Sequence, residues 1–235
     1  DGEYQFGISC EDKCGNKSDS YDSGKFIVDV TEPVVEIKGV EQGMSYKKDV
    51  AIHVKISDKY LDSTKSSVTL KGKRNKDIAL DGNINGETGN FVLKELPNDE
   101  KYDDIYTLTV KAVDKAGNTV NKEIKFSVNR FGSKYKFLDA SILGTYMNKA
   151  QNVTITEENV DKLDTKKAKV VVIRDGSEIK LDKKYVSIVE SIGSDGKYTY
   201  TYVVKKEAFD KDGKYLIQIY STADNGTSYS SVSQE

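Results

Sequence analysis

The sequence predicts an all-β protein made of two-sheet sandwiches arranged in tandem. Three observations favour this fold: two landmarks that repeat about every 100 residues, short runs of alternating apolar and polar residues, and glycine-containing turns between the runs. The chain has 235 residues, which suits about two domains of ordinary size.

A tyrosine and a glycine recur at a constant spacing. Tyr4, Tyr106 and Tyr215 each begin an alternating run, and a glycine follows each of them by 11 residues (15 − 4, 117 − 106, 226 − 215). A Phe-x-Val strand follows the first two copies, at Phe26 and Phe126, which are 100 residues apart (126 − 26). Two landmarks with one period indicate repeated structural units.

Each unit contains runs with the two-residue period of a half-buried strand. Residues 50–56 alternate aliphatic side chains with Ala51, His53 and Lys55, and the run after Tyr106 alternates likewise. Residues 170–173 are all β-branched, which indicates a strand that is buried on both faces or simply has high β-propensity. Only a short segment near residues 205–210 is predicted to be helical. The turn dipeptides are Asp81-Gly82, Asn85-Gly86, Asp175-Gly176, Asp195-Gly196 and Asp212-Gly213.

The landmarks divide the chain into three parts. Residues 1–31 are predicted to be the last two strands of a preceding domain, residues 32–130 a complete sandwich, and residues 131–235 a second, divergent sandwich. The next Phe-x-Val strand would fall near residues 235–237 (226 + 9 to 226 + 11), so we expect the second sandwich to lack its final strand. Neither junction is long or rich in glycine and serine, which predicts limited bending.

Two alternatives stay open for residues 1–31, because a two-stranded hairpin is only marginally stable alone. In the first, the hairpin completes a C-terminal domain in another copy of the chain or docks on the next domain. In the second, it is the loosely held end of a fragment.

A longer pattern surrounds the landmarks. It comprises Asp-Gly-x-Tyr at residues 1–4, Asp-Lys-Ala-Gly-Asn at residues 114–118, the Phe-x-Val strands, and Thr-x-Pro at residues 31–33. Together these motifs resemble the bacterial immunoglobulin-like (Ig-like) domains, which are tandem modules of large Gram-positive surface proteins. The resemblance implies tandem immunoglobulin-like β-sandwich domains at the bacterial cell surface or cell wall. Such modules serve as spacers, adhesins and enzyme accessories, so fold alone does not assign a ligand.

The resemblance also implies a structural role for Tyr4, Tyr106 and Tyr215. In immunoglobulin sandwiches a tyrosine near the start of the sixth strand bonds back to the backbone, an arrangement called the tyrosine corner. We expect this role above all for Tyr106 and Tyr215, and the alternative is an ordinary core tyrosine.

Composition argues against several functional classes. The chain carries 36 Lys and Arg against 38 Asp and Glu, so it lacks the basic field that a nucleic-acid-binding protein uses. No apolar run is long enough to enter a membrane, and the first residues do not resemble a signal peptide. Two cysteines and one histidine are too few for an ordinary zinc site, and no nucleophile motif accompanies His53. We therefore expect no enzyme activity and no cofactor.

Cys10 and Cys14 align with Ala112 and Ala116, on either side of a turn between two strands. Side chains across a tight hairpin can reach disulfide distance, and an extracellular setting allows the bond. We predict a disulfide here, with two small buried thiols as the alternative.

Asp81, Asn83 and Asn85 match the first ligand positions of a calcium loop, and a glycine follows at the sixth position. Val92 stands where the loop needs a bidentate glutamate. This segment is therefore a weak calcium candidate, and a polar hairpin loop is the favoured interpretation.

The favoured function is a structural stalk or spacer, whose partners are the neighbouring Ig-like domains of the same chain. One alternative is an adhesin or host-binding module that recognises a host protein or a glycan. The possible binding surface is formed by Tyr198, Tyr200 and Tyr202 of the divergent unit, because tyrosine is common in interfaces. Alternating tyrosines are also ordinary sheet residues. A further alternative is an accessory region of a surface enzyme.

Overall fold

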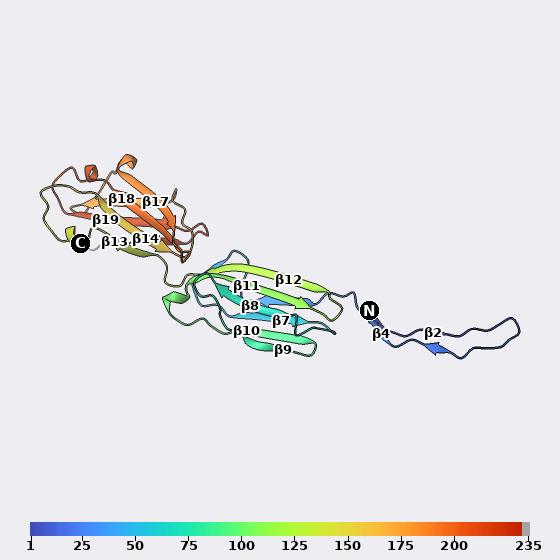
Figure 1. Ribbon diagram of the computed structural model, residues 1–235. Helices are drawn as coiled ribbons and strands as arrows, with labels where there is room; N and C mark the ends of the chain where they lie inside the picture. Colours follow the sequence, from blue (N-terminus) through green and yellow to red (C-terminus); the bar gives the residue numbers. More distant parts are fainter. Residues whose placement is uncertain (232–235) are drawn as a thin grey trace.

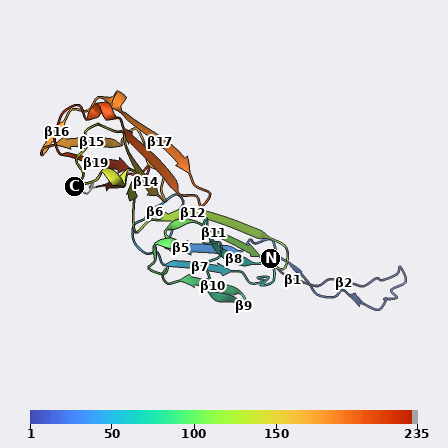
Figure 2. The same ribbon diagram turned by 60° about the vertical axis from the view of Figure 1, so that its left-hand side comes forward.

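The computed structural model describes residues 1–231 and consists almost entirely of β-structure. Two β-sandwiches follow one another along the molecule, and a thin two-stranded hairpin extends from the first sandwich on the side away from the second (Figures 1 and 2). The predicted all-β fold of immunoglobulin-like sandwiches is confirmed.

The first sandwich consists of two four-stranded sheets, ordered β5-β7-β10-β9 and β6-β12-β11-β8. Its strands are β5 (Val34–Lys38), β6 (Ser45–Tyr46), β7 (Ile52–Ser57), β8 (Ser67–Gly72), β9 (Asp81–Asn85), β10 (Thr88–Leu93), β11 (Asp104–Val113) and β12 (Thr119–Val128). This arrangement matches the immunoglobulin plan, in which strands A, B, E and D face strands G, F and C.

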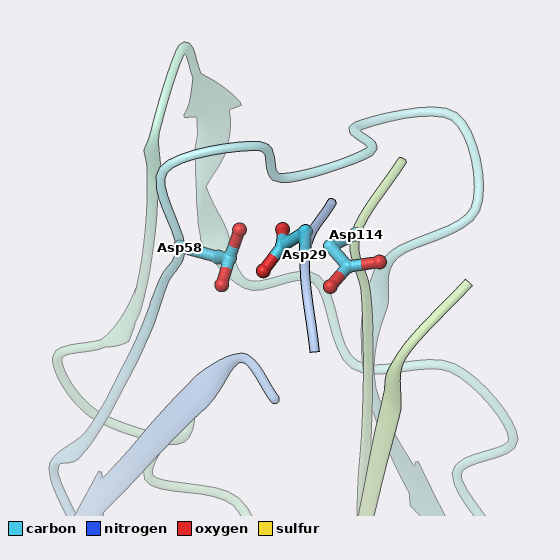
Figure 3. A group of neighbouring side chains, drawn as sticks. All are labelled: Asp29, Asp58 and Asp114. Carbon is cyan, nitrogen blue, oxygen red and sulfur yellow. The ribbon is translucent and has the colours of Figure 1, made fainter. Parts of the chain in front are cut away.

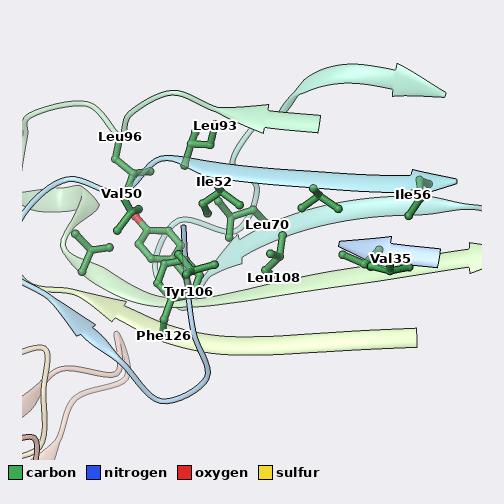
Figure 4. Packing of buried hydrophobic residues seen from close by; sticks show 14 of the residues in the cluster. Val35, Val50, Ile52, Ile56, Leu70, Leu93, Leu96, Tyr106, Leu108 and Phe126 are labelled. Carbon is green, nitrogen blue, oxygen red and sulfur yellow. The ribbon is translucent and has the colours of Figure 1, made fainter. Parts of the chain in front are cut away.

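One apolar core lies between these two sheets (Figure 4). Strand β7 buries Ile52, Val54 and Ile56 and exposes the residues between them, as the two-residue period predicts. The ring of Tyr106 on β11 stacks on that of Phe126 on β12, with centroids 5.6 Å apart. The two landmarks of the repeat therefore belong to the core of this sandwich.

The second sandwich has sheets ordered β13-β14-β18-β17 and β16-β15-β19-β20. Its strands are β13 (Lys134–Phe137), β14 (Val153–Asn159), β15 (Lys169–Arg174), β16 (Ser177–Ile179), β17 (Val186–Ile192), β18 (Tyr198–Val204), β19 (Tyr215–Thr222) and β20 (Ser228–Ser230). It encloses a separate apolar core.

The final strand of the second sandwich begins within the chain, contrary to expectation. Strand β20 pairs antiparallel with β19, as β12 pairs with β11 in the first sandwich. Each of these strands starts two residues after the landmark glycine (228 − 226 and 119 − 117). The expected Phe-x-Val landmark near residues 235–237 lies outside the described residues.

Each arm of the N-terminal hairpin is divided into two short strands, and within residues 1–231 these four strands pair only with one another. They are β1 (Gly2–Tyr4), β2 (Gly7–Ile8), β3 (Tyr21–Asp22) and β4 (Phe26–Val28). The hairpin points away from the first sandwich (Figure 1). Docking of the hairpin on the next domain, which is one half of the first alternative, is therefore wrong, whereas its pairing with another copy stays a prediction.

Within residues 1–231, the helices are four 3₁₀ turns. They are η1 (Glu100–Tyr102), η2 (Ala140–Ile142), η3 (Lys183–Tyr185) and η4 (Lys206–Ala208). The last of these is the short helical segment that the sequence predicts. None of the described helices has the length and hydropathy needed to cross a membrane.

Candidate functional site

A buried hydrogen-bond network occupies the junction between the two sandwiches. Asn129, the first residue after β12, places its Nδ2 atom 2.9 Å from Asn159 Oδ1, 2.9 Å from Asp161 Oδ2 and 3.0 Å from the Tyr229 hydroxyl. Asn129 lies at the end of the first sandwich, and its three partners belong to the second sandwich. Asn129, Asn159 and Asp161 are all buried, so these contacts are shielded from water.

Asp161 also accepts hydrogen bonds from two serines of the first sandwich. The Ser45 hydroxyl lies 2.6 Å from Asp161 Oδ2, and the Ser127 hydroxyl lies 2.5 Å from Asp161 Oδ1. Hydrogen bonds to a carboxylate are shorter and stronger than those between neutral groups. Both oxygens of this carboxylate are thus satisfied by the opposite sandwich, which fixes the orientation of one sandwich on the other.

The network continues into the second sandwich as far as Glu157, whose side chain is completely buried. Asn159 Nδ2 donates to Ser133 Oγ at 2.6 Å, and that hydroxyl donates to Glu157 Oε1 at 2.5 Å. The other donors to this carboxylate are the hydroxyls of Tyr135 (2.9 Å), Tyr202 (2.6 Å) and Ser221 (2.6 Å). Four hydroxyls therefore replace the water that a buried charge needs.

The tyrosines around Glu157 are held in the protonated, donating form. Burial, followed by the nearby Glu157 carboxylate, raises the pKa of Tyr202 far above its usual range. Burial is also the main cause of the raised pKa of Tyr135. Both hydroxyls consequently remain donors at neutral pH.

The connection between the sandwiches is anchored to the first sandwich by an ion pair. Arg130 Nε lies 2.9 Å from Asp103 Oδ1, and both side chains are almost completely buried. The Phe131 amide donates to the other oxygen of this aspartate at 2.7 Å. A buried ion pair is weak evidence for stability, but here it fixes the path of the backbone.

Two lysines of the second sandwich reach Glu100 of the first. Lys134 hydrogen-bonds Glu100 Oε2, and Lys197 Nζ lies 3.7 Å from Glu100 Oε1. The hydrogen bond from Lys134 is the main cause of the lowered pKa of the Glu100 carboxyl. These partly exposed contacts add electrostatic attraction at the rim of the buried network.

Two hollows lie in the described part of the chain, one at the junction and one on the first sandwich. The cavity at the junction measures about 10 Å³, enough for one water molecule and too small for a substrate. A wide groove of about 470 Å³ on the first sandwich includes Ile78, Leu93 and Tyr102. No histidine, cysteine or serine lines either hollow.

Two of the three landmark tyrosines make the same hydrogen bond, and Tyr4 differs from them. The Tyr106 hydroxyl donates to the Tyr102 carbonyl at 2.6 Å, and the Tyr215 hydroxyl donates to the Lys211 carbonyl at 2.6 Å. Each bond reaches four residues back, which is the geometry of a tyrosine corner. Tyr4 is instead 48% exposed, since the hairpin has no second sheet to cover it.

The expected tyrosine binding surface is wrong. Tyr200 and Tyr202 are buried in the core of the second sandwich, and Tyr198 is half-buried. Strand β18 lies between β14 and β17, so its inward side faces the opposite sheet. Tyr200 accepts a hydrogen bond from the Leu163 amide at 2.7 Å, which satisfies its hydroxyl internally.

The predicted disulfide is not formed, and its alternative is also wrong. Cys10 and Cys14 are both free and exposed. The Ser18 amide donates to the Cys10 carbonyl, so the hairpin places Ser18 opposite Cys10. Cys14 lies within the turn instead, where its amide donates to Asp12. The thiols are not buried because nothing packs on this hairpin.

The weak calcium candidate at Asp81, Asn83 and Asn85 does not form a calcium-binding loop. These residues form strand β9, in which Asn83 pairs with Asn90 of β10. A strand rises about 3.3 Å per residue, so alternate side chains are too widely spaced to surround an ion as a loop does. His53, on the outward face of β7, is exposed as expected.

Sequence reasoning missed the polar network at the junction. One signal was present, because Glu157 and Asn159 continue the inward-facing positions of Val153 and Ile155 on β14. A charged residue at a core position needs buried partners. Those partners come from distant segments, and a single sequence does not identify them.

Comparison with known families assigns the first part of the chain. Residues 1–129 match the family model described as bacterial Ig-like domain (group 3). The match covers the hairpin and the first sandwich and ends at Asn129. No curated protein matches the chain.

Proposed function

The chain belongs to the bacterial Ig-like domains of group 3, and we propose that it is a stiff, non-catalytic spacer in an extracellular bacterial protein. Domains of this family are commonly extracellular and typically non-catalytic. In this role the two sandwiches hold neighbouring modules at a fixed separation and orientation.

The observation that carries this proposal is the hydrogen-bonded junction. Only five residues separate β12 from β13 (134 − 128 − 1). The first of them, Asn129, contacts Asp161 in a buried network that spans both sandwiches. Flexible tethers instead have exposed glycine and serine without fixed partners. Bending here requires several buried polar groups to lose their partners at once, which is costly.

The adhesin alternative has less support from the sandwiches. Its expected aromatic surface rested on Tyr200 and Tyr202, whose side chains are buried. The exposed aromatic side chains that pack on one another are instead on the N-terminal hairpin, where Tyr4 and Phe6 both lie against Phe26.

For residues 1–31, we propose that they are the last two strands of another Ig-like unit. The exposed Tyr4 and Phe26 correspond in the repeat to Tyr106 and Phe126, which are buried in the first sandwich. The face of the hairpin therefore carries core residues without the opposing sheet. The partner that fits it is the remainder of an Ig-like sandwich, with an apolar inward face.

Small-angle X-ray scattering tests the spacer role. We expect the curve of the intact chain to fit one extended conformation of the two sandwiches, apart from the hairpin. Asp161→Ala removes the acceptor for Ser45 and Ser127, and we expect it to require an ensemble of bent conformations. The matched control is Asp164→Ala, whose carboxylate contacts only nearby residues of its own turn. A wild-type chain that already requires a broad ensemble contradicts the proposal.

A further inference from the structure

We propose that Asp29, Asp58 and Asp114 bind a calcium ion where the N-terminal hairpin joins the first sandwich. One oxygen from each carboxylate lies within 4.8 Å of the other two, and Figure 3 shows the three side chains next to one another. They come from three separate segments: the connection from β4 to β5, the end of β7 and the end of β11. This group is distinct from Asp81 on β9.

An unsatisfied oxygen within this group indicates that a positive partner is missing. Asp29 Oδ2 is shielded from solvent and has no hydrogen-bond partner among residues 1–231. The other oxygen of Asp29 accepts a hydrogen bond from the Thr31 amide at 3.2 Å. A buried carboxylate oxygen without a donor is unfavourable, and two adjacent carboxylates make it more so.

The other two aspartates are preorganised around this oxygen. The Asp114 side chain is completely buried and accepts hydrogen bonds from the Gly117 and Asn118 amides at 2.7 and 2.8 Å. Asp58 Oδ1 accepts from the Tyr60 amide at 2.6 Å. No ion pair joins a lysine or arginine to any of the three aspartates within residues 1–231. The three carboxylates are thus held in place without a direct ion pair to a basic side chain.

The second junction of the chain provides an internal comparison. Asn129 occupies the position of Asp29 in the repeat, since 129 − 29 equals the 100-residue offset of the Phe-x-Val strands. At the second junction its amide group contacts Asn159 and Asp161. At the first junction the Asp29 carboxylate takes the place of the Asn129 amide group. It lies next to the carboxylates of Asp58 and Asp114. A cation performs there the bridging that the amide performs at the second junction.

The chemistry of the group favours calcium among the common ions. Calcium takes six to eight oxygen ligands at about 2.3–2.6 Å, so ligands on opposite sides are about 5 Å apart, which agrees with the observed separations. Each carboxylate offers one oxygen to the shared position, and water completes the shell. Magnesium demands a more rigid octahedron, and zinc prefers histidine and cysteine, which this group lacks.

A bound ion would stiffen the connection between the hairpin and the first sandwich. Asp29 belongs to the hairpin side, and the other two ligands belong to the sandwich. One direct hydrogen bond already joins them, from Asn118 Nδ2 to the Asp29 carbonyl at 3.1 Å. The site does not depend on the spacer role, because it lies at the other end of the first sandwich from the junction network.

Isothermal titration calorimetry of the calcium-free chain with calcium chloride tests the site. We expect one ion per chain, with a dissociation constant in the range of about 10⁻⁴–10⁻³ M that extracellular modules show. Asp29→Asn and Asp58→Asn should each weaken binding at least about tenfold, because fewer charged ligands remain. Both variants retain the oxygen that accepts from Thr31 or Tyr60, so the fold should persist, which circular dichroism checks.

Two control variants make the titration specific. Asp19→Asn removes an exposed charge from the same hairpin, and Asp81→Asn removes one from β9. Both should bind calcium as the wild type does. The proposal is overturned if the wild type gives no saturable heat up to about 10 mM calcium, ten times the weak end of that range. It is equally overturned if Asp29→Asn binds unchanged, or if Asp19→Asn or Asp81→Asn weakens binding as much.

Discussion

At the scale of single residues, side-chain hydroxyl groups donate many of the hydrogen bonds that buried carboxylates and backbone carbonyls accept. Glu157 receives four hydroxyl hydrogen bonds, and Asp161 receives two from serines of the opposite sandwich. The hydroxyls of Tyr106 and Tyr215 each donate to the backbone carbonyl four residues earlier in the chain. Around Glu157 and Asp161 burial makes these hydrogen bonds important, because no water replaces a lost partner.

The tyrosine corner of the first sandwich leads to the first prediction. Tyr106→Phe removes the bond to the Tyr102 carbonyl and should lower the free energy of unfolding by about 1–2 kcal/mol. Urea denaturation followed by circular dichroism measures this change. Tyr4→Phe is the control and should leave stability unchanged, since the exposed Tyr4 makes no such bond. Equal effects of the two substitutions would contradict the assignment of Tyr106.

The buried carboxylate of the second sandwich leads to the second prediction. Glu157→Gln keeps the shape of the side chain but replaces a charged acceptor with a neutral amide that faces hydroxyl donors. We expect unfolding of this sandwich to become easier by about 1–3 kcal/mol, measured by the same denaturation. Glu158→Gln, on the exposed face of β14, should have little effect. A neutral result at position 157 would show that the negative charge of Glu157 contributes nothing to stability.

At the scale of strands, the sequence predicts a feature well where the local pattern determines it. The alternation along β7 identifies the buried face, because apolar and polar residues occupy opposite sides. The buried face of strand β18 is harder to predict, because tyrosines such as Tyr200 and their threonine neighbours are found on either face of a sheet. The disulfide prediction at Cys10 and Cys14 assumed a hairpin register that the structure does not have.

Features that depend on two distant segments were beyond the sequence. Asp161 accepts from Ser45 and Ser127, which lie 116 and 34 positions away in the sequence. The aspartates at positions 29, 58 and 114 likewise meet only after the strands between them have paired. A repeat period indicates that modules exist, but it does not specify the polar contacts between them.

The turn after β5 leads to a prediction about backbone geometry. Gly39 has φ of +94°, and a Cβ atom there would lie 1.8 Å from the Ala51 carbonyl oxygen. Gly39→Ala should therefore destabilise the first sandwich by more than about 2 kcal/mol, as judged by its thermal midpoint. Gly43 has φ of +76° but open space around it, so Gly43→Ala should cost only about 1 kcal/mol. Equal losses would mean that backbone strain alone determines the effect.

At the scale of the whole molecule, buried tyrosines predict loss of stability at high pH. Burial raises the pKa of Tyr229 to about 12 and that of Tyr202 further still. An unfolded tyrosine ionises near pH 10, so above that pH the unfolded chain releases protons that the folded chain retains. The stabilising contribution is complete below about pH 10 and is lost as the pH rises toward 12 and beyond.

Urea midpoints across the alkaline range measure this effect. We expect them to be constant between about pH 8 and pH 9.5 and to fall steeply by about pH 11. Absorbance of tyrosinate should rise with unfolding for the buried tyrosines and before unfolding for exposed ones. A constant midpoint up to about pH 11.5 would mean that the buried tyrosines ionise in the folded state.

The spacer role requires that the two sandwiches keep one mutual orientation in solution. The buried network around Asn129 and Asp161, together with the five-residue connection, is the physical basis for this requirement. Residual dipolar couplings of backbone amides in residues 34–128 and 134–230 measure that orientation directly. One alignment tensor should fit both sandwiches when they are oriented as in the structure. Two tensors of clearly different magnitude would contradict the account, because they would mean that the sandwiches reorient independently.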